Sequence, residues 1–225
     1  MSLQSYIKEQ QNMEEYVCYF SGVASVNNPR ALFGSAFTNE YIAKLQLNCT
    51  KTNEYPDKVP NNTFGSSDLR YNPGAGQKLV DIDMKEVNSK YHNVSVSKGE
   101  INKNVAIGII TKYNNALCLI IVNLKDIPAN SKSLIKDRFY TISEKTIIDY
   151  AWYKEPLKPA YATLYEKLMS AYNNVSAIDK IEYGADQTVF RNAAEEFLNQ
   201  FADAYKAICG KIPVIKFVLN NLEIF

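Results

Sequence analysis

Histidine and paired cysteines are nearly absent from this chain of 225 residues, which has one histidine, His92, and four cysteines. The cysteines are far apart and form no CxxC pair, so we expect no structural zinc and interpret them as small apolar core residues. His92 alone would have to serve any Ser–His or Cys–His nucleophile, and no GxSxG motif is present. We therefore expect a surface histidine, no cofactor and no enzymatic activity.

Long apolar runs and an excess of either charge are also lacking. No stretch reaches the roughly 20 apolar residues of a membrane span, and the polar start MSLQSYIKEQQNMEEY has no signal-peptide core. We expect a cytoplasmic protein, in the host cell if it is viral, with no membrane partner. The 25 basic and 24 acidic residues balance, which argues against neutralisation of a long duplex backbone, because each phosphate contact needs its own cation.

A phosphate-binding loop is missing as well. The stretch RYNPGAGQK (70–78) has two glycines and a lysine, but it lacks the spacing, the Ser/Thr and the following helix of GxxxxGK[ST]. We interpret it as the end of a long loop over 51–77. Arg70 and Lys78 would contact a nucleic-acid backbone and Tyr71 would stack on a base; an ordinary exposed loop is the alternative.

Enough apolar residues are present, 46%, to bury a core. Strand patterns occur at 14–26, 39–50, 78–87 and 92–98. The segment 104–127 predicts a hairpin around Tyr113-Asn114-Asn115, because asparagine tolerates the positive φ of tight turns. Its second strand, 116–124, is continuously apolar and should be buried on both faces.

The period changes to a helical one in the last part of the chain. Helices are predicted from Pro159 onward and from Asp186 to Gly210, and a strand is favoured within KIPVIKFVLNNLEIF (211–225). The sequence thus predicts an α+β protein, with a β domain over 1–127 and a helical region over 128–225 packed against it.

Aromatic residues are abundant, with 16 Tyr, 10 Phe and one Trp. In the β region they are interleaved with Lys and Arg, a pattern that suits single-stranded nucleic acid because bases stack on rings while cations meet phosphates. Ordinary strand tyrosines and surface lysines are the alternative. The contacts we expect are Tyr19, Arg30, Tyr41, Lys44, Arg70, Tyr71, Lys78, Lys112 and Tyr113.

The stretches YVCYFSGVASVNNPRALFGSAFTNEYIAKLQLN (16–48) and GEINKNVAIGIITKYNNALCLIIVNLKDI (99–127) arrange an aromatic strand, a Pro-Arg loop, an alternating strand and a late Tyr-centred hairpin. This order resembles the single-stranded-DNA-binding proteins of T7-like phages over residues 1–127. The resemblance implies an antiparallel OB-fold β-barrel that protects single strands in replication and recombination, beside other replication proteins. The chain departs from the family by its apolar end, NLEIF, and its additional helices.

Two other functions stay open. A viral structural or assembly protein would suit the near-zero net charge and would form large homo-oligomers without nucleic acid. A Mg²⁺-dependent nuclease would use Asp81 and Asp83, which share one strand face about 7 Å apart at ~3.4 Å per residue. For these two residues a solvated strand face is the alternative.

Overall fold

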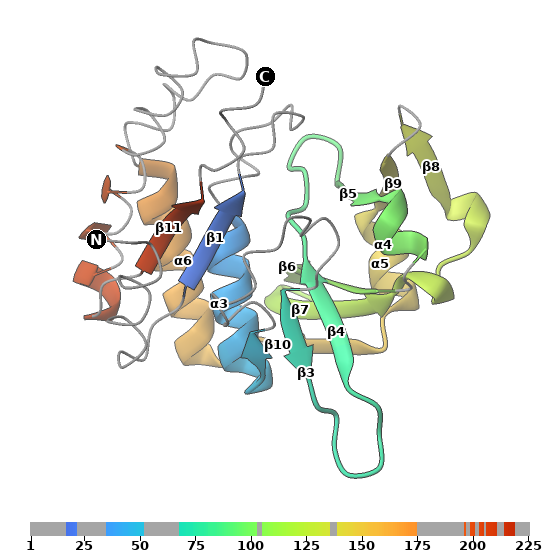
Figure 1. The fold of residues 1–225 in the computed structure, drawn as a ribbon, viewed down its shortest axis with the longest axis horizontal. Helices are drawn as coiled ribbons and strands as arrows, with labels where there is room; N and C mark the ends of the chain where they lie inside the picture. The colour runs from blue at the N-terminus through green and yellow to red at the C-terminus, as the bar shows by residue number, and fades with distance from the viewer. Residues whose placement is uncertain are drawn as a thin grey trace. The chain divides into compact units, whose positions relative to one another are not determined.

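The fold is mixed α+β in this computed structural model (Figure 1). The structure describes residues 17–21, 35–51, 68–102, 105–135, 139–174, 196, 199–200, 203–204, 206–210 and 214–218. The chain divides into two units, one formed by 1–38 with 163–225 and the other by 39–162. The boundary expected at residue 127 stays a prediction, although strands of the second unit's sheets continue beyond it.

A six-stranded sheet is the centre of the unit 39–162. Its strand order is β10 (Tyr153–Pro156), β7 (Ala116–Asn123), β6 (Ala106–Tyr113), β4 (Val80–Met84), β3 (Leu69–Tyr71) and β2 (Thr50–Lys51). Strands β4 and β6 are parallel and the other neighbours are antiparallel. A second sheet has the order β5 (Asn93–Ser97), β9 (Phe139–Ser143) and β8 (Lys132–Ile135).

The predicted hairpin is confirmed as β6 and β7. Asn114 and Asn115 have φ of 49° and 63°, the left-handed pair that a two-residue turn of type I′ requires. Residues 119–122 of β7 are fully buried, as its continuous apolar run indicates. One face packs against β5, β9 and helix α5 (Glu144–Tyr150) in a shared hydrophobic core.

The opposite sheet face is shaped by a glycine. Met84, Gly108 and Ile121 lie in one row across β4, β6 and β7. A Cβ on Gly108 would lie 2.5 Å from the Sδ of Met84, which is far inside van der Waals contact. The missing side chain is therefore what allows Met84 to pack over β6.

The strand expected over 39–50 is wrong, because helix α3 spans Ser35–Leu47. Four of its buried residues recur at helical spacing: Asn39, Ile42, Ala43 and Leu47. The side chain of Asn39 donates to the carbonyl of Lys85 at 3.4 Å, and that of Gln46 donates to the carbonyl of Pro156 at 3.1 Å. The helix is thus tied to the end of β4 and to β10. Polar residues on its buried face interrupted the apolar stripe that would have predicted a helix.

The six-stranded sheet is curled into a partial barrel. Strands β10 and β3 are four strand spacings apart, roughly 19 Å in a flat sheet at about 4.8 Å per strand. The ring of Tyr71 nevertheless stacks on Trp152, with centroids 6.2 Å apart. Because side chains stand nearly perpendicular to a sheet, strands β10 and β3 must bend toward each other.

The region 128–225, expected to be the helical part of the chain, also contains the strands β8, β9 and β10 beside helix α5. The predicted strands at 78–87 and 92–98 are confirmed as β4 and β5, whereas the expected loop over 51–77 contains strand β3 before its last residues, 72–77. Other short elements are α4 (Lys98–Asn102) and the 3₁₀ turns Leu124–Asp126 and Ala129–Ser131.

The other unit contains two parallel strands, β1 (Val17–Ser21) and β11 (Val214–Val218). They confirm strands within 14–26 and 211–225. Helix α6 spans Pro159–Asn174 and confirms the helix predicted from Pro159. Residues 206–209 are helical and Gly210 follows with φ of 70°, as expected of a helix end, while Asp186 lies outside the described residues. No helix in the described part is long and apolar enough to cross a membrane.

Candidate nucleic-acid interface

Three aromatic residues, Tyr71, Trp152 and Tyr153, form a cluster that we call the aromatic platform. The rings of Tyr71 and Trp152 are stacked, with an interplanar angle of 19°. The rings of Trp152 and Tyr153 meet edge to face, with centroids 6.1 Å apart. Trp152 is 40% exposed, so part of its ring surface remains accessible to a ligand.

Residues of β7 and α3 form hydrogen bonds with the residues of the platform. The backbone N–H of Trp152 donates to the carbonyl of Ile121 at 3.0 Å, and Tyr153 pairs with the same residue. Burial raises the pKa of the Tyr153 hydroxyl, while a hydrogen bond from Gln46 acts in the opposite direction. Gln46 also accepts from the backbone N–H of Lys158 at 3.1 Å. The rings are therefore fixed by hydrogen bonds that do not occupy their exposed faces.

A loop with one cation, Lys78, follows Tyr71 of the platform. Between β3 and β4 the chain projects beyond the sheet (Figure 1), and Lys78 is exposed there. The side chain of Asn72 accepts from the N–H of Gly74 at 3.1 Å, and Gly74 and Gly76 have φ of 133° and 83°. These positive φ values need glycine. The glycines thus form a turn, and no helix follows them.

Arg70 lies on β3, next to Tyr71. Its Nε donates to Asp81 Oδ1 at 2.8 Å and its terminal nitrogen to Asp81 Oδ2 at 3.3 Å. The hydrogen bonds to Asp81 raise the pKa of the guanidinium. Both side chains stay about half exposed, so the guanidinium remains accessible to a second anion.

Lys112 and Tyr113 do not join the platform. The platform lies at the end of β6 that begins with Ala106, since Tyr71 pairs with Val80, two residues before the partner of Ala106. Tyr113 ends the strand roughly 24 Å away at ~3.4 Å per residue. There the ammonium of Lys154 lies 5.1 Å from the centroid of the Tyr113 ring, and Lys112 is exposed.

The remaining predicted contacts are dispersed. Tyr41 and Lys44 lie on α3 and are partly buried, so Tyr41 does not occupy a barrel strand. Tyr19 pairs with Lys216 between β1 and β11, in the other unit. Arg30 lies outside the described residues. Sequence reasoning missed Trp152 and Tyr153, although the aromatic cluster with a lysine in YAWYK, which includes the one tryptophan of the chain, was a readable signal.

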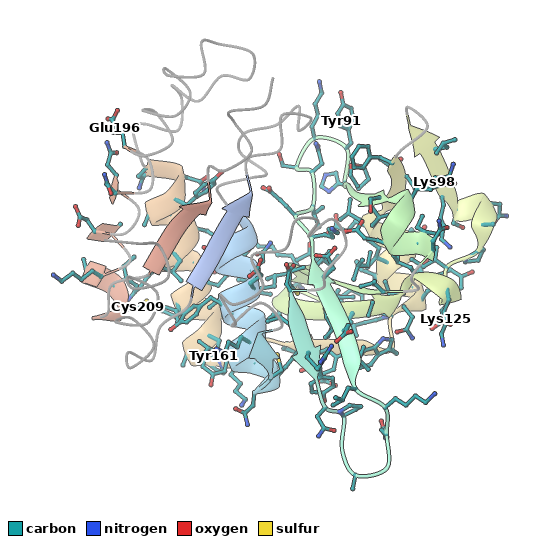
Figure 2. The ribbon with its side chains drawn as sticks, in the orientation of Figure 1. Tyr91, Lys98, Lys125, Tyr161, Glu196 and Cys209 are labelled. Atoms are coloured by element: carbon teal, nitrogen blue, oxygen red, sulfur yellow. The ribbon has the colours of Figure 1, made fainter. Side chains whose placement is uncertain are left out.

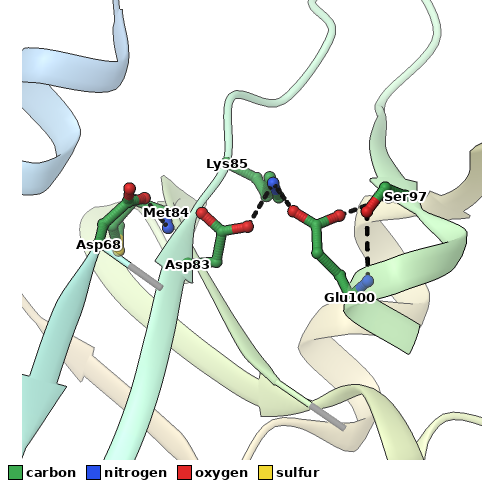
Figure 3. Close-up of polar contacts among 6 residues, drawn as sticks. All are labelled: Asp68, Asp83, Met84, Lys85, Ser97 and Glu100. Carbon is green, nitrogen blue, oxygen red and sulfur yellow. Dashed lines mark hydrogen bonds and ion pairs between the residues drawn. The ribbon is translucent and has the colours of Figure 1, made fainter. Parts of the chain in front are cut away.

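The carboxylates of the nuclease hypothesis are both occupied by cations. Asp81 pairs with Arg70, and Asp83 Oδ2 lies 2.6 Å from the Nζ of Lys85. The same ammonium lies 2.5 Å from Glu100 Oε1, so Lys85 bridges two carboxylates (Figure 3). Among the residues that the structure describes, no three His, Cys, Asp or Glu side chains are arranged to hold a metal ion.

Further hydrogen bonds extend this network. Asp68 accepts from the N–H of Met84 at 2.8 Å, and Glu100 accepts from the N–H of Ser97 while its own N–H donates to the Ser97 hydroxyl at 3.2 Å. The Ser97–Glu100 pair is a capping box at the start of α4. The network therefore connects β3, β4 and α4.

Burial is the main influence on the acids of this network. It raises the pKa of Asp68 well above its usual range, reinforced by Glu40 and Asp83, and it raises that of Glu100. Burial opposes ionisation of Asp83 too, but Lys85 and the neighbouring carboxyl groups hold the pKa of Asp83 below its usual value. Burial disfavours the charge of Lys85, yet its two carboxylates raise the pKa of the ammonium. The arrangement is that of an internal ion pair.

Comparison with protein-family models, curated proteins and solved structures gives no match to this chain. The choice among functions therefore depends on the geometry of the described residues. The aromatic platform presents the exposed ring of Trp152, whereas Asp83 and Glu100 form internal pairs with Lys85.

Proposed function

We propose that the protein binds single-stranded DNA without sequence preference, through the aromatic platform and the cations Arg70 and Lys78, on an OB-like curled sheet. It would act without catalysis, in the replication or recombination of a virus or phage, in the host cytoplasm. The observation that carries the proposal is the stack of Tyr71 on a half-exposed Trp152 at the base of a projecting, cation-bearing loop.

Stacking supplies the affinity in this proposal. Base–aromatic stacking contributes about 1–3 kcal/mol per base and tolerates every base, because each has a π-face. Trp152 has the largest aromatic ring in the chain, and the ring of Tyr71 stacks on it. A base that stacks on this pair must be unpaired, so the platform favours single strands over a duplex.

Charge supplies a smaller part. Arg70, on the face of β3 opposite to Tyr71, and Lys78, in the loop that follows β3, would each neutralise one phosphate. Two contacts give a salt dependence with a slope near −1.4 on a log–log plot, from about −0.7 per phosphate for single strands. A protein that depended on a duplex backbone would need many more cations than this region contains.

Trp152 provides the test, because it is the chain's only tryptophan. Titration with an oligo-dT of about 16 nucleotides, the upper end of the site size of one OB fold, should quench its fluorescence. By anisotropy of a labelled oligonucleotide, Trp152→Leu should bind roughly 5- to 150-fold more weakly, which corresponds to the loss of one stacked base.

Phe139→Leu is the matched control, since Phe139 is similarly exposed, at 45%, but lies on the other sheet. It should bind like the parent chain. Equal affinity of Trp152→Leu and the parent, or preference for the matching duplex, would contradict the proposal. Absence of binding at low salt would instead direct attention to assembly, measured by light scattering.

A further inference from the structure

The chain's single histidine is held by a carboxylate. The Nδ1 of His92 lies 3.0 Å from Glu144 Oε2, and the other oxygen of Glu144 accepts from the Thr111 hydroxyl. The His92 side chain is 74% exposed, whereas that of Glu144 is only 15% exposed. A fixed carboxylate in the protein therefore orients an imidazole at the surface.

The backbone around His92 is fixed as well. His92 has φ of 48°, its N–H donates to the carbonyl of Asn88 at 2.8 Å, and its carbonyl accepts from the N–H of Glu144 at 2.8 Å. The side chain of Asn88 accepts from the N–H groups of Lys90 and Tyr91 at 2.9 and 3.0 Å. The turn that presents residues 90–92 is thus held at both of its ends.

An aromatic ring and a cation accompany the histidine. Tyr91 is the most exposed large side chain among the described hydrophobic residues, at 63%, and Figure 2 shows it pointing away from the ribbon. The Nζ of Lys90 lies 5.1 Å from its ring centroid. Lys90, Tyr91 and His92 together repeat the combination of ring and cation found at the platform, and we call them the 90–92 triplet.

Glu144 gives the imidazole two opposite behaviours. When His92 is neutral, its one proton serves the bond from Nδ1 to Glu144, so Nε2 presents a lone pair, which repels a phosphate oxygen. When His92 is protonated, Nε2 presents an N–H, and a charge-assisted hydrogen bond to phosphate becomes available. The charged groups beside it are Glu144 on α5 and Lys90 on the same turn.

We propose that the 90–92 triplet is a second contact for single-stranded DNA, in which Tyr91 stacks on a base and protonated His92 binds a phosphate. The inference rests on the proposed function. The triplet follows β4 beyond Met84, and the platform lies beside the start of β4, so one strand of DNA would run along β4 to contact both. Histidine ordinarily changes its charge between pH 5 and 8, so binding should tighten in mild acid.

The decisive variant is His92→Asn, because asparagine is neutral and tolerates positive φ. By anisotropy with oligo-dT, the parent should bind roughly tenfold more tightly at pH 5.5 than at pH 8, as expected for one charge-assisted bond. His92→Asn should lose that difference and keep the affinity at pH 8. The same pH dependence in both chains would overturn the inference and leave the proposed function intact.

A measurement without DNA separates the two proposals. The imidazole signals of the chain need no assignment, because there is one histidine. Nitrogen-15 NMR should show the neutral ring with its proton on Nδ1, and inorganic phosphate at pH 5.5 should shift the ring signals to saturation, whereas chloride of equal ionic strength should not. A neutral ring with its proton on Nε2, or ring signals that do not respond to phosphate, would overturn the inference. This result does not depend on whether the platform binds DNA.

Discussion

Replacing Lys85 by methionine tests how far the ionic network of Figure 3 stabilises the unit 39–162. The ammonium lies 2.6 Å from Asp83 and 2.5 Å from Glu100, and the three side chains are 19%, 11% and 9% exposed. Methionine has a similar length and no charge. The substitution therefore leaves two largely buried carboxylates without their cation and changes the packing little.

The expected loss is large. Removing one partner of a buried ion pair destabilises a protein by about 3–5 kcal/mol, against a total free energy of unfolding of about 5–15 kcal/mol for a typical domain. Without Lys85 the folded-state pKa of Asp83 should rise above that of the unfolded chain, and the pKa of Glu100, which burial already raises, should rise further. A carboxyl group whose pKa is higher in the folded state than in the unfolded state stabilises the fold at low pH. This contribution is lost as pH rises, by about 1.4 kcal/mol per pH unit for each proton.

Urea unfolding at pH 5 and pH 8 measures both the size of the loss in unfolding free energy and the direction in which it changes with pH. Trp152 is in the same unit, so its fluorescence follows the relevant transition. The loss in Lys85→Met should be greater at pH 8 than at pH 5. Lys145→Met, which removes an exposed pair with Asp149, should be indistinguishable from the parent. A loss below about 1 kcal/mol at pH 8, or an equal loss at both values, would refute the reasoning.

Two further substitutions test local features by the same urea measurement. Gly108→Ala should lower the free energy of unfolding by about 1–3 kcal/mol through overpacking, because its Cβ would meet the Sδ of Met84 at 2.5 Å. Adding Met84→Ala in the same chain should recover part of that free energy, and an unchanged stability of Gly108→Ala would contradict this account. Ser143→Ala should lower the free energy of unfolding by about 1 kcal/mol, since the Ser143 side chain accepts from the N–H of Thr146 at 3.0 Å at the start of α5. Ser143→Gly should be as stable in urea as the parent, whereas a Ser143→Ala chain as stable as the parent would contradict this role.

Local signals in the sequence were enough for the elements whose conformation depends on near neighbours. Two asparagines between apolar runs specify the β6–β7 hairpin, because few residues adopt positive φ at both turn positions. Pro159 and the helical recurrence after it specify the start of α6. At these places the local sequence is sufficient to specify the conformation that the structure has.

Elements that depend on distant partners were missed. Strand β10 has four residues and exists through its pairing with β7, and a segment that short has no period to detect. Helix α3 buries Asn39, whose amide is bonded to the carbonyl of Lys85, and no sequence pattern identifies that partner. The aromatic platform was missed for the same reason, since curling of the sheet brings Tyr71 to Trp152.

The acidic residues show why a strand pattern alone cannot separate a metal site from an ion pair. In a strand, residues two apart share a face, so Asp81 and Asp83 suggest paired ligands, but by the same rule Lys85 lies near Asp83. Glu100 then adds a second carboxylate, which its capping box with Ser97 holds in place. A lysine that follows such carboxylates at the same spacing therefore supplies the positive charge that a metal ion would otherwise have to provide.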